Sequence, residues 1–493
     1  MTRKAFDITL TDFTGGLNDN EKMNAIADNE LSKAHNVLVS DKGIGTRGGF
    51  DPISGIENLK KSFVIYKTNG LKSILHFSDT AFYEDTTQKV ITDSVNTDYI
   101  KCITYKNTAG HDVVVMHDNG FLKVYNGSSI ENVVPKTPSS DEETNLGKND
   151  LSSLTNVRAA TMKDGRFFIA GHPTKKNMIH YSAVDLTSAY ADYTYFPANF
   201  SFVVSSEDND EICCLKVFRE HLIVFCKRNI YAVKGYLGSS LTEENEIVKL
   251  NVESGVVAPD SICEVENSIF YMSELGVYEI FNTDENYVSA RKISDNITNT
   301  LKTVTASTGK AVFYDNKYIL NFDEMTFVYD VRYGCWVTWG IGPITNIRKD
   351  GDDLYIIKAG NEMKYNPTSY KDGETIFHPY ILTKSFDYDY IKKSKKIKRI
   401  YYVFEQYLQS LNHAFVVELW VDSVKVKEHE VSTKISGVFD EALFDETTFD
   451  FQSFVSVEKK TLIKGNFIQL GIKATEQSAF HIFNINLEGS VRL

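Results

Sequence analysis

The stretch Ser268-Ile-Phe-Tyr-Met-Ser-Glu-Leu-Gly-Val-Tyr-Glu-Ile-Phe281 consists of two short apolar runs separated by a polar turn that contains a glycine. Aromatic and β-branched residues favour strands, and glycine supplies the backbone angles that a tight turn needs. The stretch therefore predicts two antiparallel strands joined by a short turn.

The same theme returns along most of the chain, at Ser73–Tyr83, Asp112–Tyr125, Arg166–Ala170, His221–Val233, Lys317–Asn321 and Leu354–Ile357. In Asp112–Tyr125 the dipeptide Asn119-Gly120 is a strong hairpin signal. The hydrophobic centres of the repeats lie 36 to 55 residues apart, at Ile74, Val114, Phe168, Ile223, Ile269, Ile319 and Tyr355. Four-stranded propeller blades repeat at about 40–50 residues, so the series predicts an irregular β-propeller of six to eight blades, with seven expected. A series of β-sandwiches is the alternative.

The pattern changes near residue 378. Beyond it, Phe415–Lys427, Phe467–Lys473 and Phe480–Leu487 alternate apolar and polar residues, as strands of an antiparallel sandwich do. Near the N-terminus, Ala27–His35 has the spacing of a short helix that Asp28 could cap. We therefore predict an all-β protein in three parts: an N-terminal arm with a short helix at 1–60 that packs on the propeller, a β-propeller at 61–377, and a C-terminal antiparallel β-sandwich at 378–493.

Composition sets broad limits on function. The chain of 493 residues has a net charge of −13, so it lacks the overall basic character of a protein that grips duplex DNA. No apolar run approaches the ~18–20 residues that cross a bilayer, and no secretory signal is visible. The six cysteines form no C-x-x-C and are interpreted as buried thiols of a protein made in a reducing cytoplasm. The densest basic run, Ile391–Arg399, is interpreted as an edge strand defended by lysines.

Gly43, Gly45 and Gly48 in Val37–Phe50 have the spacing G-x-G-x-x-G. That pattern binds a dinucleotide only where a helix opens directly from it, because the pyrophosphate lies on the helix N-terminus. Here Pro52 and Gly55 follow instead, and both disfavour a helix. No nucleotide or other cofactor is therefore expected at this stretch.

Other catalytic and metal motifs are not found. The chain has no G-x-S-x-G, no Walker A sequence and no H-E-x-x-H. His111 and His117 lack two further ligands at metal spacing, and the acidic runs Asp208–Glu211 and Asp350–Asp353 lack the order of a calcium loop. We therefore expect solvated turns at both runs and assign no catalytic, cofactor or metal residues.

An ordered set of short segments resembles the tail-hub and tail-nozzle proteins of tailed bacteriophages. The N-terminal part of the set is Asp12-Phe-Thr-Gly-Gly-Leu-Asn18, then Asn36, Gly43 and Arg47-Gly48. Gly165–Ala183, Leu222–Gly235, Ser254–Tyr278 and Val328–Trp339 are similar to later segments of that family, in the same order. The resemblance spans most of the chain.

The resemblance implies a structural virion protein and not an enzyme. It implies a homo-oligomeric ring in the head-to-tail connector, with six copies favoured and twelve second, that contacts portal, adaptor and other tail proteins. Double-stranded DNA would pass through this ring without sequence-specific binding, along the ring axis and not through one propeller, and the ring would help retain or release the genome. Assembly would occur in the host cytoplasm. Acidic loops such as Glu207–Glu211 and Phe439–Asp450 are expected to face that channel.

In this interpretation the segment Phe13–Phe50 is extended, packs on the propeller or a neighbouring chain, and is dispensable for the propeller fold. Gly45, Gly48 and Gly49 would let the arm turn as it enters the propeller. Arg47 would either fork onto a carboxylate there or be solvated. The alternative function is a carbohydrate-binding or carbohydrate-cleaving propeller, since propellers host glycosidases that use paired carboxylates.

Overall fold

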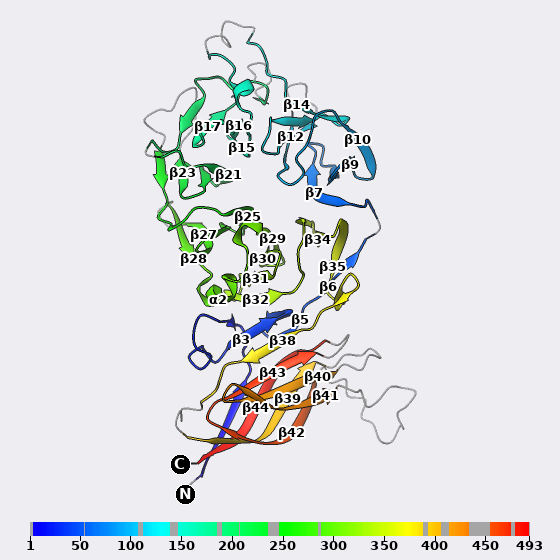
Figure 1. Ribbon diagram of the computed structural model, residues 1–493, viewed down its shortest axis with the longest axis vertical. Coiled ribbons are helices and arrows are strands. Elements are labelled where there is room, and N and C mark those ends of the chain that lie inside the picture. The colour runs from blue at the N-terminus through cyan, green and yellow to red at the C-terminus, as the bar shows by residue number, and fades with distance from the viewer. Residues whose placement is uncertain are drawn as a thin grey trace.

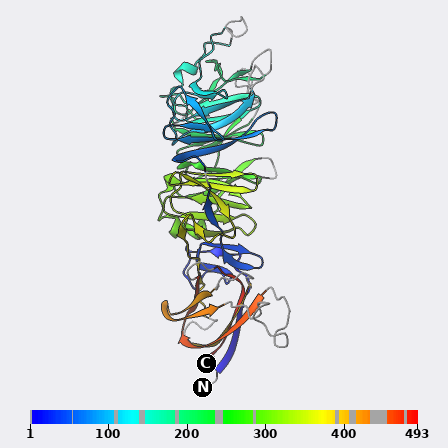
Figure 2. The same cartoon turned by 90° about the vertical axis from the view of Figure 1, so that its right-hand side faces the viewer.

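A computed structural model describes residues 3–53, 55–106, 112–138, 146–184, 190–206, 208–234, 246–283, 287–387, 393–405, 414–432, 454–474 and 479–492. Figure 1 shows a ring of small sheets around an open centre, with a second body of strands beyond the rim of that ring. Seen edge-on in Figure 2, the molecule is long and narrow. The described part contains one short α-helix, α2 (Thr298–Leu301), and is otherwise built almost wholly from strands.

The ring is a seven-bladed β-propeller, because the strands form seven antiparallel groups of four. Blade 1 contains β7 (Leu59–Tyr66), β8 (Lys72–Ser78), β9 (Phe82–Glu84) and β10 (Thr87–Ile91); blade 2 contains β11 (Lys101–Lys106), β12 (Asp112–His117), β13 (Lys123–Tyr125) and β14 (Ser129–Asn132). Blade 3 contains β15 (Ala159–Lys163), β16 (Arg166–Ala170), β17 (Met178–Tyr181) and β20 (Ser201–Val203), and blade 4 contains β21 (Ile212–Phe218), β22 (His221–Cys226), β23 (Ile230–Lys234) and β24 (Glu246–Lys249).

The remaining three blades complete the ring. Blade 5 contains β25 (Ala258–Val265), β26 (Ser268–Ser273), β27 (Gly276–Asn282) and β28 (Val288–Lys292), and blade 6 contains β29 (Lys310–Tyr314), β30 (Lys317–Asn321), β31 (Thr326–Asp330) and β32 (Cys335–Trp339). Blade 7 contains β33 (Asn346–Asp350), β34 (Asp353–Lys358), β35 (Asn361–Asn366) and β6 (Gly49–Pro52). Its fourth strand thus comes from the N-terminal arm, so the two ends of the propeller sequence are joined within one sheet.

Each repeat centre predicted from the sequence lies in the second strand of its blade, from Ile74 in β8 to Tyr355 in β34. The predicted hairpin in Ser268–Phe281 is the β26–β27 pair, whose register places Ser273 opposite Gly276. The predicted hairpin at Asn119-Gly120 also forms, but its last paired residues are Met116 and Lys123, so its loop is longer than two residues. The period and the number of blades are therefore confirmed.

Apolar side chains fill the spaces between neighbouring blades. One cluster joins blades 3 and 4 through Phe168 and Leu222, and another joins blades 4 and 5 through Phe225 and Tyr271. Because a blade is apolar on both faces, it is stable only between two others, which is why the blades close into a ring. At the junction of blades 7 and 1 the contacts include polar ones, such as the Lys72–Asp350 ion pair at 2.9 Å.

The second body is the predicted β-sandwich, built from both ends of the chain. One sheet contains β1 (Arg3–Leu10), β4 (Val37–Ser40), β5 (Gly43–Thr46), β39 (Lys395–Glu405), β42 (Phe454–Gly465) and β44 (His481–Arg492). The facing sheet contains β2 (Gly16–Leu17), β3 (Glu30–His35), β38 (Tyr380–Thr383), β40 (Ala414–Val421), β41 (Val424–Ser432) and β43 (Ile468–Ala474). Phe404 and Phe415 meet edge to face at 5.3 Å in the core between the two sheets.

Three expectations about the arm are wrong. The predicted helix at Ala27–His35 is strand β3 over Glu30–His35, because Leu31 and Ala34 are buried and the strand pairs with β38 of the sandwich. The arm is also not a separate part of the fold, since its strands belong to blade 7 and to both sandwich sheets. It is therefore not dispensable, because removing Phe13–Phe50 would take buried side chains out of the core that the propeller and the sandwich share.

The interpretation of the basic run Ile391–Arg399 as an edge strand is also wrong. Residues 391 and 392 lie outside the described part, but Lys395–Arg399 belong to β39, which pairs with β42 on one side and β44 on the other. Lys398 and Arg399 are exposed while Ile397 and Ile400 are buried. Lys398 and Arg399 therefore mark the solvent face of a central strand, whereas Lys395 is buried.

Candidate functional site

The glycine-rich stretch Val37–Phe50 forms strands and not a phosphate loop. Gly43 begins β5 and Gly49 begins β6, so no helix follows the pattern. A Cβ on Gly43 would lie 2.0 Å from the carbonyl oxygen of Ile482, and one on Gly49 would lie 2.0 Å from that of Lys371. These glycines thus permit close backbone contact. They do not provide the expected turn, since of the cluster only Gly43 has a positive φ, +135°.

Arg47 lies between β5 and β6 and binds a carboxylate with two hydrogen bonds, which is the first of its two expected roles. Its guanidinium donates to both carboxylate oxygens of Asp372, at 3.0 and 2.6 Å, and its Nε donates to Asn36 Oδ1 at 2.9 Å. The ring of Phe377 lies 3.7 Å from the guanidinium carbon. Arg47 is fully buried, so this bidentate pair joins the arm to the segment that leaves blade 7.

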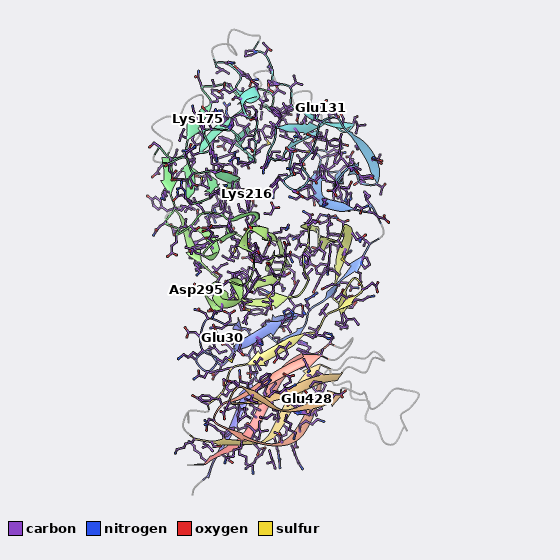
Figure 3. The ribbon with its side chains drawn as sticks, in the orientation of Figure 1. Glu30, Glu131, Lys175, Lys216, Asp295 and Glu428 are labelled. Carbon is purple, nitrogen blue, oxygen red and sulfur yellow. The ribbon has the colours of Figure 1, made fainter. Side chains whose placement is uncertain are left out.

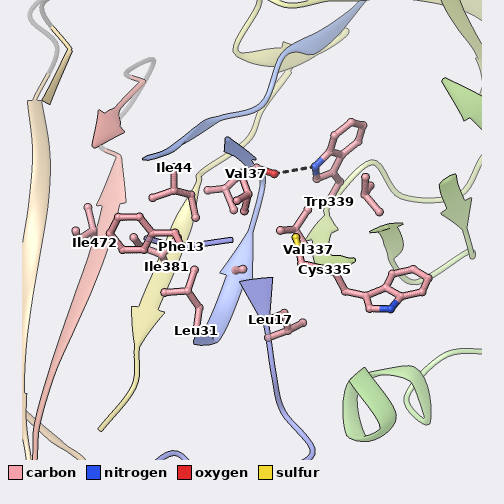
Figure 4. Packing of buried hydrophobic residues seen from close by; sticks show 14 of the residues in the cluster. Phe13, Leu17, Leu31, Val37, Ile44, Cys335, Val337, Trp339, Ile381 and Ile472 are labelled. Atoms are coloured by element: carbon pink, nitrogen blue, oxygen red, sulfur yellow. Dashed lines mark hydrogen bonds between the residues drawn. The ribbon is translucent and has the colours of Figure 1, made fainter. Parts of the chain in front are cut away.

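Strand β3 extends the connection from blade 6 to the sandwich. It pairs with β32 of blade 6 on one side and β38 of the sandwich on the other. Trp339 of β32 donates its indole N–H to the carbonyl of Val37 at 3.1 Å, and apolar side chains from all three parts surround this bond (Figure 4). The propeller and the sandwich therefore form one continuous body at this point, which we call the arm junction (residues 30–52, 335–340 and 372–383).

His35 lies inside the arm junction. Its Nδ1 lies 3.0 Å from the hydroxyl of Thr338. Burial, and next the positive charge of Arg47, lower the pKa of His35 from 6.5 to about 4. The imidazole is therefore neutral at physiological pH.

The two acidic runs that could have bound calcium are engaged within the chain. Asp210 accepts the backbone N–H groups of Arg228 and Asn229, and Glu211 pairs with Arg158 at 2.7 Å. Asp350 ends β33 and pairs with Lys72. Within the described ranges no group of three or more His, Cys, Asp or Glu residues is placed to hold a metal ion. His111 and the acidic loop Phe439–Asp450 lie outside the described residues.

The propeller axis contains three adjoining cavities that share Asp260 of β25. Their volumes are about 510, 360 and 680 Å³, the size of small-molecule sites. We call them the outer, middle and rear chambers in that order. Figure 3 shows the open centre of the ring, with Lys216 at its edge.

Asp260 is the electrostatic centre of this axis. Lys61 of β7 donates to it at 3.3 Å, and Lys101 of β11 also forms a short contact with it. Burial by itself would raise the pKa of Asp260, but Lys101 and Lys61 outweigh burial and hold that pKa well below its usual range. Burial lowers the pKa of Lys61, and the neighbouring charges of Lys101 and Lys310 add to that effect. Two ammonium groups thus contact one ionised carboxylate, and Lys310 lines the same middle chamber.

These axial residues were missed in the sequence because they are up to 249 positions apart, from Lys61 to Lys310. A signal was nevertheless present. Each lies in the first strand of its blade, and in a propeller the first strands line the axis. Every first strand contains at least one charged residue, so this signal indicates the axis but does not single out these four residues.

The thiols near the axis are unsuited to nucleophilic chemistry. Burial raises the pKa of Cys213 to about 12 and that of Cys263 to about 11. A thiol must ionise to act as a nucleophile, and a raised pKa opposes that. Cys226 and Cys335 are buried thiols as predicted, whereas Cys102, Cys213, Cys214 and Cys263 are partly exposed.

Comparison with known proteins identifies no family for this chain. No protein-family profile matches the chain, and no curated protein matches it. Solved structures do match, but their TM-scores are too low to carry an argument. One is the extracellular domain of the putative hybrid two-component system BT4673 from B. thetaiotaomicron, at TM-score 0.41 and 12% identity over 88% of this chain and 61% of that one.

Two further matches are also weak. PorZ, a bacterial surface component of the type-IX secretion system of Porphyromonas gingivalis, matches at TM-score 0.36 and 10% identity, over 71% of this chain and 45% of that one. The Neurospora crassa Pan2 WD40 domain matches at TM-score 0.35 and 9% identity, over 67% of this chain and 97% of that one. The chain thus spans about half to two thirds of the length of PorZ and of BT4673. Among the described residues no helix is long and apolar enough to cross a membrane.

Proposed function

We propose that this chain is a structural virion protein of a tailed bacteriophage, a subunit of a ring in the head-to-tail connector, tail hub or nozzle. The observation that carries the proposal is the arm junction. There the N-terminal arm completes blade 7 and joins the propeller to the sandwich. The arm contains Gly-Gly, Asn36 and Arg47-Gly48 in an order that resembles the arm of that family. A subunit that transmits load along a tail needs such a continuous body.

The two ends of this body have unlike surfaces, which favours head-to-tail association into a closed ring. Exposed apolar side chains occur at both ends. Val90 and Val134 of blades 1 and 2 are 62% and 79% exposed, and Val424 and Val426 on the edge strand β41 of the sandwich are 62% and 51% exposed. An edge strand leaves backbone groups free for a neighbour. We assign these two surfaces to the contact between one subunit and the next, with six copies favoured and twelve second.

The DNA channel of this proposal lies on the ring axis. The axial chambers of one propeller have the volume of a small molecule, so a duplex cannot pass through them. Asp208 and Glu211 contribute little free charge to a channel, because Arg228 and Arg158 pair with them. Electrostatic repulsion between the channel wall and the passing DNA therefore depends on acidic side chains of other segments, and Phe439–Asp450 is the other candidate named from the sequence. The ring would contact portal, adaptor and other tail proteins and help to retain or release the genome, in a virion assembled in the host cytoplasm.

Electron cryomicroscopy of the purified chain, and of tailed virions that contain it, tests this proposal. We expect rings with sixfold symmetry in which the blade 1–2 end contacts the sandwich of the next subunit. Val134→Glu and Val426→Glu should each leave the subunit folded but prevent the ring. Val248→Glu, on the outer strand of blade 4, is the matched control and should leave the ring intact. A monomer in the virion, or duplex DNA threaded through a single propeller, would refute the proposal.

The alternative of a carbohydrate-cleaving propeller receives less support. A glycosidase needs one carboxyl group protonated as an acid, with a raised pKa. Three carboxylates line the outer chamber: Asp260, Glu211 and Glu274. Asp260 and Glu211, which both pair with basic side chains, have lowered pKa values because neighbouring cations outweigh the effect of burial. Neither is suited to donate a proton, so we infer a non-enzymatic role.

A further inference from the structure

The middle chamber of the propeller axis has an unusual excess of positive charge. Its lining includes five basic side chains and a single carboxylate: Lys61, Lys101, Lys310, Arg348 and Lys349 against Asp260. The chain as a whole is acidic, with a net charge of −13. The basic character is therefore specific to this cavity and not a property of the surface in general.

The contacts within the chamber do not neutralise this excess. Asp260 is shared by Lys61 and Lys101. The Lys310 ammonium donates to the carbonyl of Thr308 at 3.0 Å, which adds no negative charge. Arg348 is paired with Glu362, at 2.8 Å. Lys61 is only 5% exposed, so part of this positive charge is held out of water, where an uncompensated charge is costly.

A second feature also points to a polar occupant of the axis. His117 lines the outer chamber next to Lys101 and is 6% exposed, and among the described residues its Nδ1 has no hydrogen-bond partner. Buried polar atoms are nearly always hydrogen-bonded, so an unpaired one at a cavity wall needs an explanation. A ligand that reaches from the middle chamber past Lys101 would supply the missing partner.

We propose that the propeller axis binds a small, multiply charged oxyanion of the phosphate type, held by Lys101, Lys310 and Lys61. Ammonium groups bind phosphate as point charges from several directions and do not require the planar geometry of a carboxylate–guanidinium pair. The volume of about 360 Å³ accepts a pyrophosphate-sized group. The bound anion acts as a counter-ion that joins the first strands of blades 1, 2 and 6. This inference is independent of the proposed ring, because it concerns a single subunit.

Isothermal titration calorimetry with inorganic pyrophosphate and the full-length chain tests the inference. We expect one site per chain. Lys310→Gln should weaken binding about tenfold, because a hydrogen bond to a charged group is lost. Lys310 is only partly buried, so this variant should fold, and its melting temperature without ligand should stay close to that of the original chain. Lys175→Gln on the outer face of blade 3 removes the same charge away from the axis and should bind as the original chain does (Figure 3).

Two further titrations identify the source of the phosphate group. Inorganic phosphate tests the isolated anion, and a short single-stranded oligonucleotide tests the backbone of a nucleic acid. Weaker binding of either ligand by Lys310→Gln supports the inference, and the ligand with the lower Kd identifies the source. The absence of binding at millimolar concentration of all three ligands would overturn it. Equal affinity of the Lys310→Gln and Lys175→Gln variants would overturn it as well.

Discussion

Replacing Arg47 by methionine tests whether the arm junction holds the propeller and the sandwich together. The arginine makes hydrogen bonds to Asn36, Gly48 and Asp372, and the side chains of Arg47 and Asp372 are 0% and 2% exposed. Methionine keeps much of the apolar volume but leaves the carboxylate buried without its partner. Removing one partner of a buried ion pair costs about 3–5 kcal/mol. We expect Arg47→Met to lower the free energy of unfolding by that amount.

Urea unfolding followed by tryptophan fluorescence measures this loss. The three tryptophans are Trp336, Trp339 and Trp420, and the ring of Trp339 lies 5.5 Å from the guanidinium carbon of Arg47, so the fluorescence signal reports on the junction. Arg219→Met, at an exposed site of blade 4, makes the same substitution and should cost less than about 0.5 kcal/mol.

A double variant separates the ion pair from general packing. Arg47→Met combined with Asp372→Leu removes both charges, so it should recover a large part of the loss, since apolar replacement of a whole buried pair is often neutral. Two results would refute the reasoning. One is a loss below about 1 kcal/mol for Arg47→Met, and the other is a double variant no more stable than the single one.

Three other properties follow from the same structure. Gly49→Ala should destabilise the protein by about 1–3 kcal/mol because its Cβ would meet a backbone carbonyl. Gly55 has open space around it, so Gly55→Ala should have little effect in the same urea assay, and equal losses of unfolding free energy in the two variants would contradict this. The pKa of His35 is about 4 in the folded protein and 6.5 in the unfolded chain. The unfolded chain therefore binds a proton first as the pH falls, so the contribution of the neutral imidazole to the free energy of unfolding is fully present above pH 6.5 and is lost as the pH falls towards 4. Between pH 7.5 and 5 this effect lowers the free energy of unfolding by about 2 kcal/mol, and the fall should be smaller by that amount in His35→Gln. The same pH profile in both proteins would argue against a buried neutral imidazole. Finally, Cys213 and Cys263 should react with iodoacetamide at pH 8 roughly a hundredfold more slowly in the folded protein than in urea, because their raised pKa leaves little thiolate. Mass spectrometry of the alkylated peptides measures both rates, and equal rates in the two conditions would contradict the prediction.

The sequence by itself determined the all-β class, the seven-fold repeat and the presence of a β-sandwich after the propeller. These features are local, because a blade is a meander of consecutive strands whose apolar runs and turns repeat along the chain. Ile74 and Tyr355 marked the first and last blades for this reason, although each lies in a second strand. The exclusion of a phosphate loop was also local, since it depended on the residues that follow Gly48.

Only the tertiary structure decided how the parts join. The spacing of Ala27, Leu31 and Ala34 suits a helix, yet Glu30–His35 is a strand because β38 and β32 offer backbone partners on either side. Nothing near Arg47 in sequence identifies Asp372 as its partner, 325 positions away. Lys61, Lys101, Asp260 and Lys310 converge for a similar reason: their blades are far apart in sequence and meet only when the ring closes. Periodicity is a property of neighbours along the chain, whereas closure of the ring and burial of charge depend on residues that are brought together by folding.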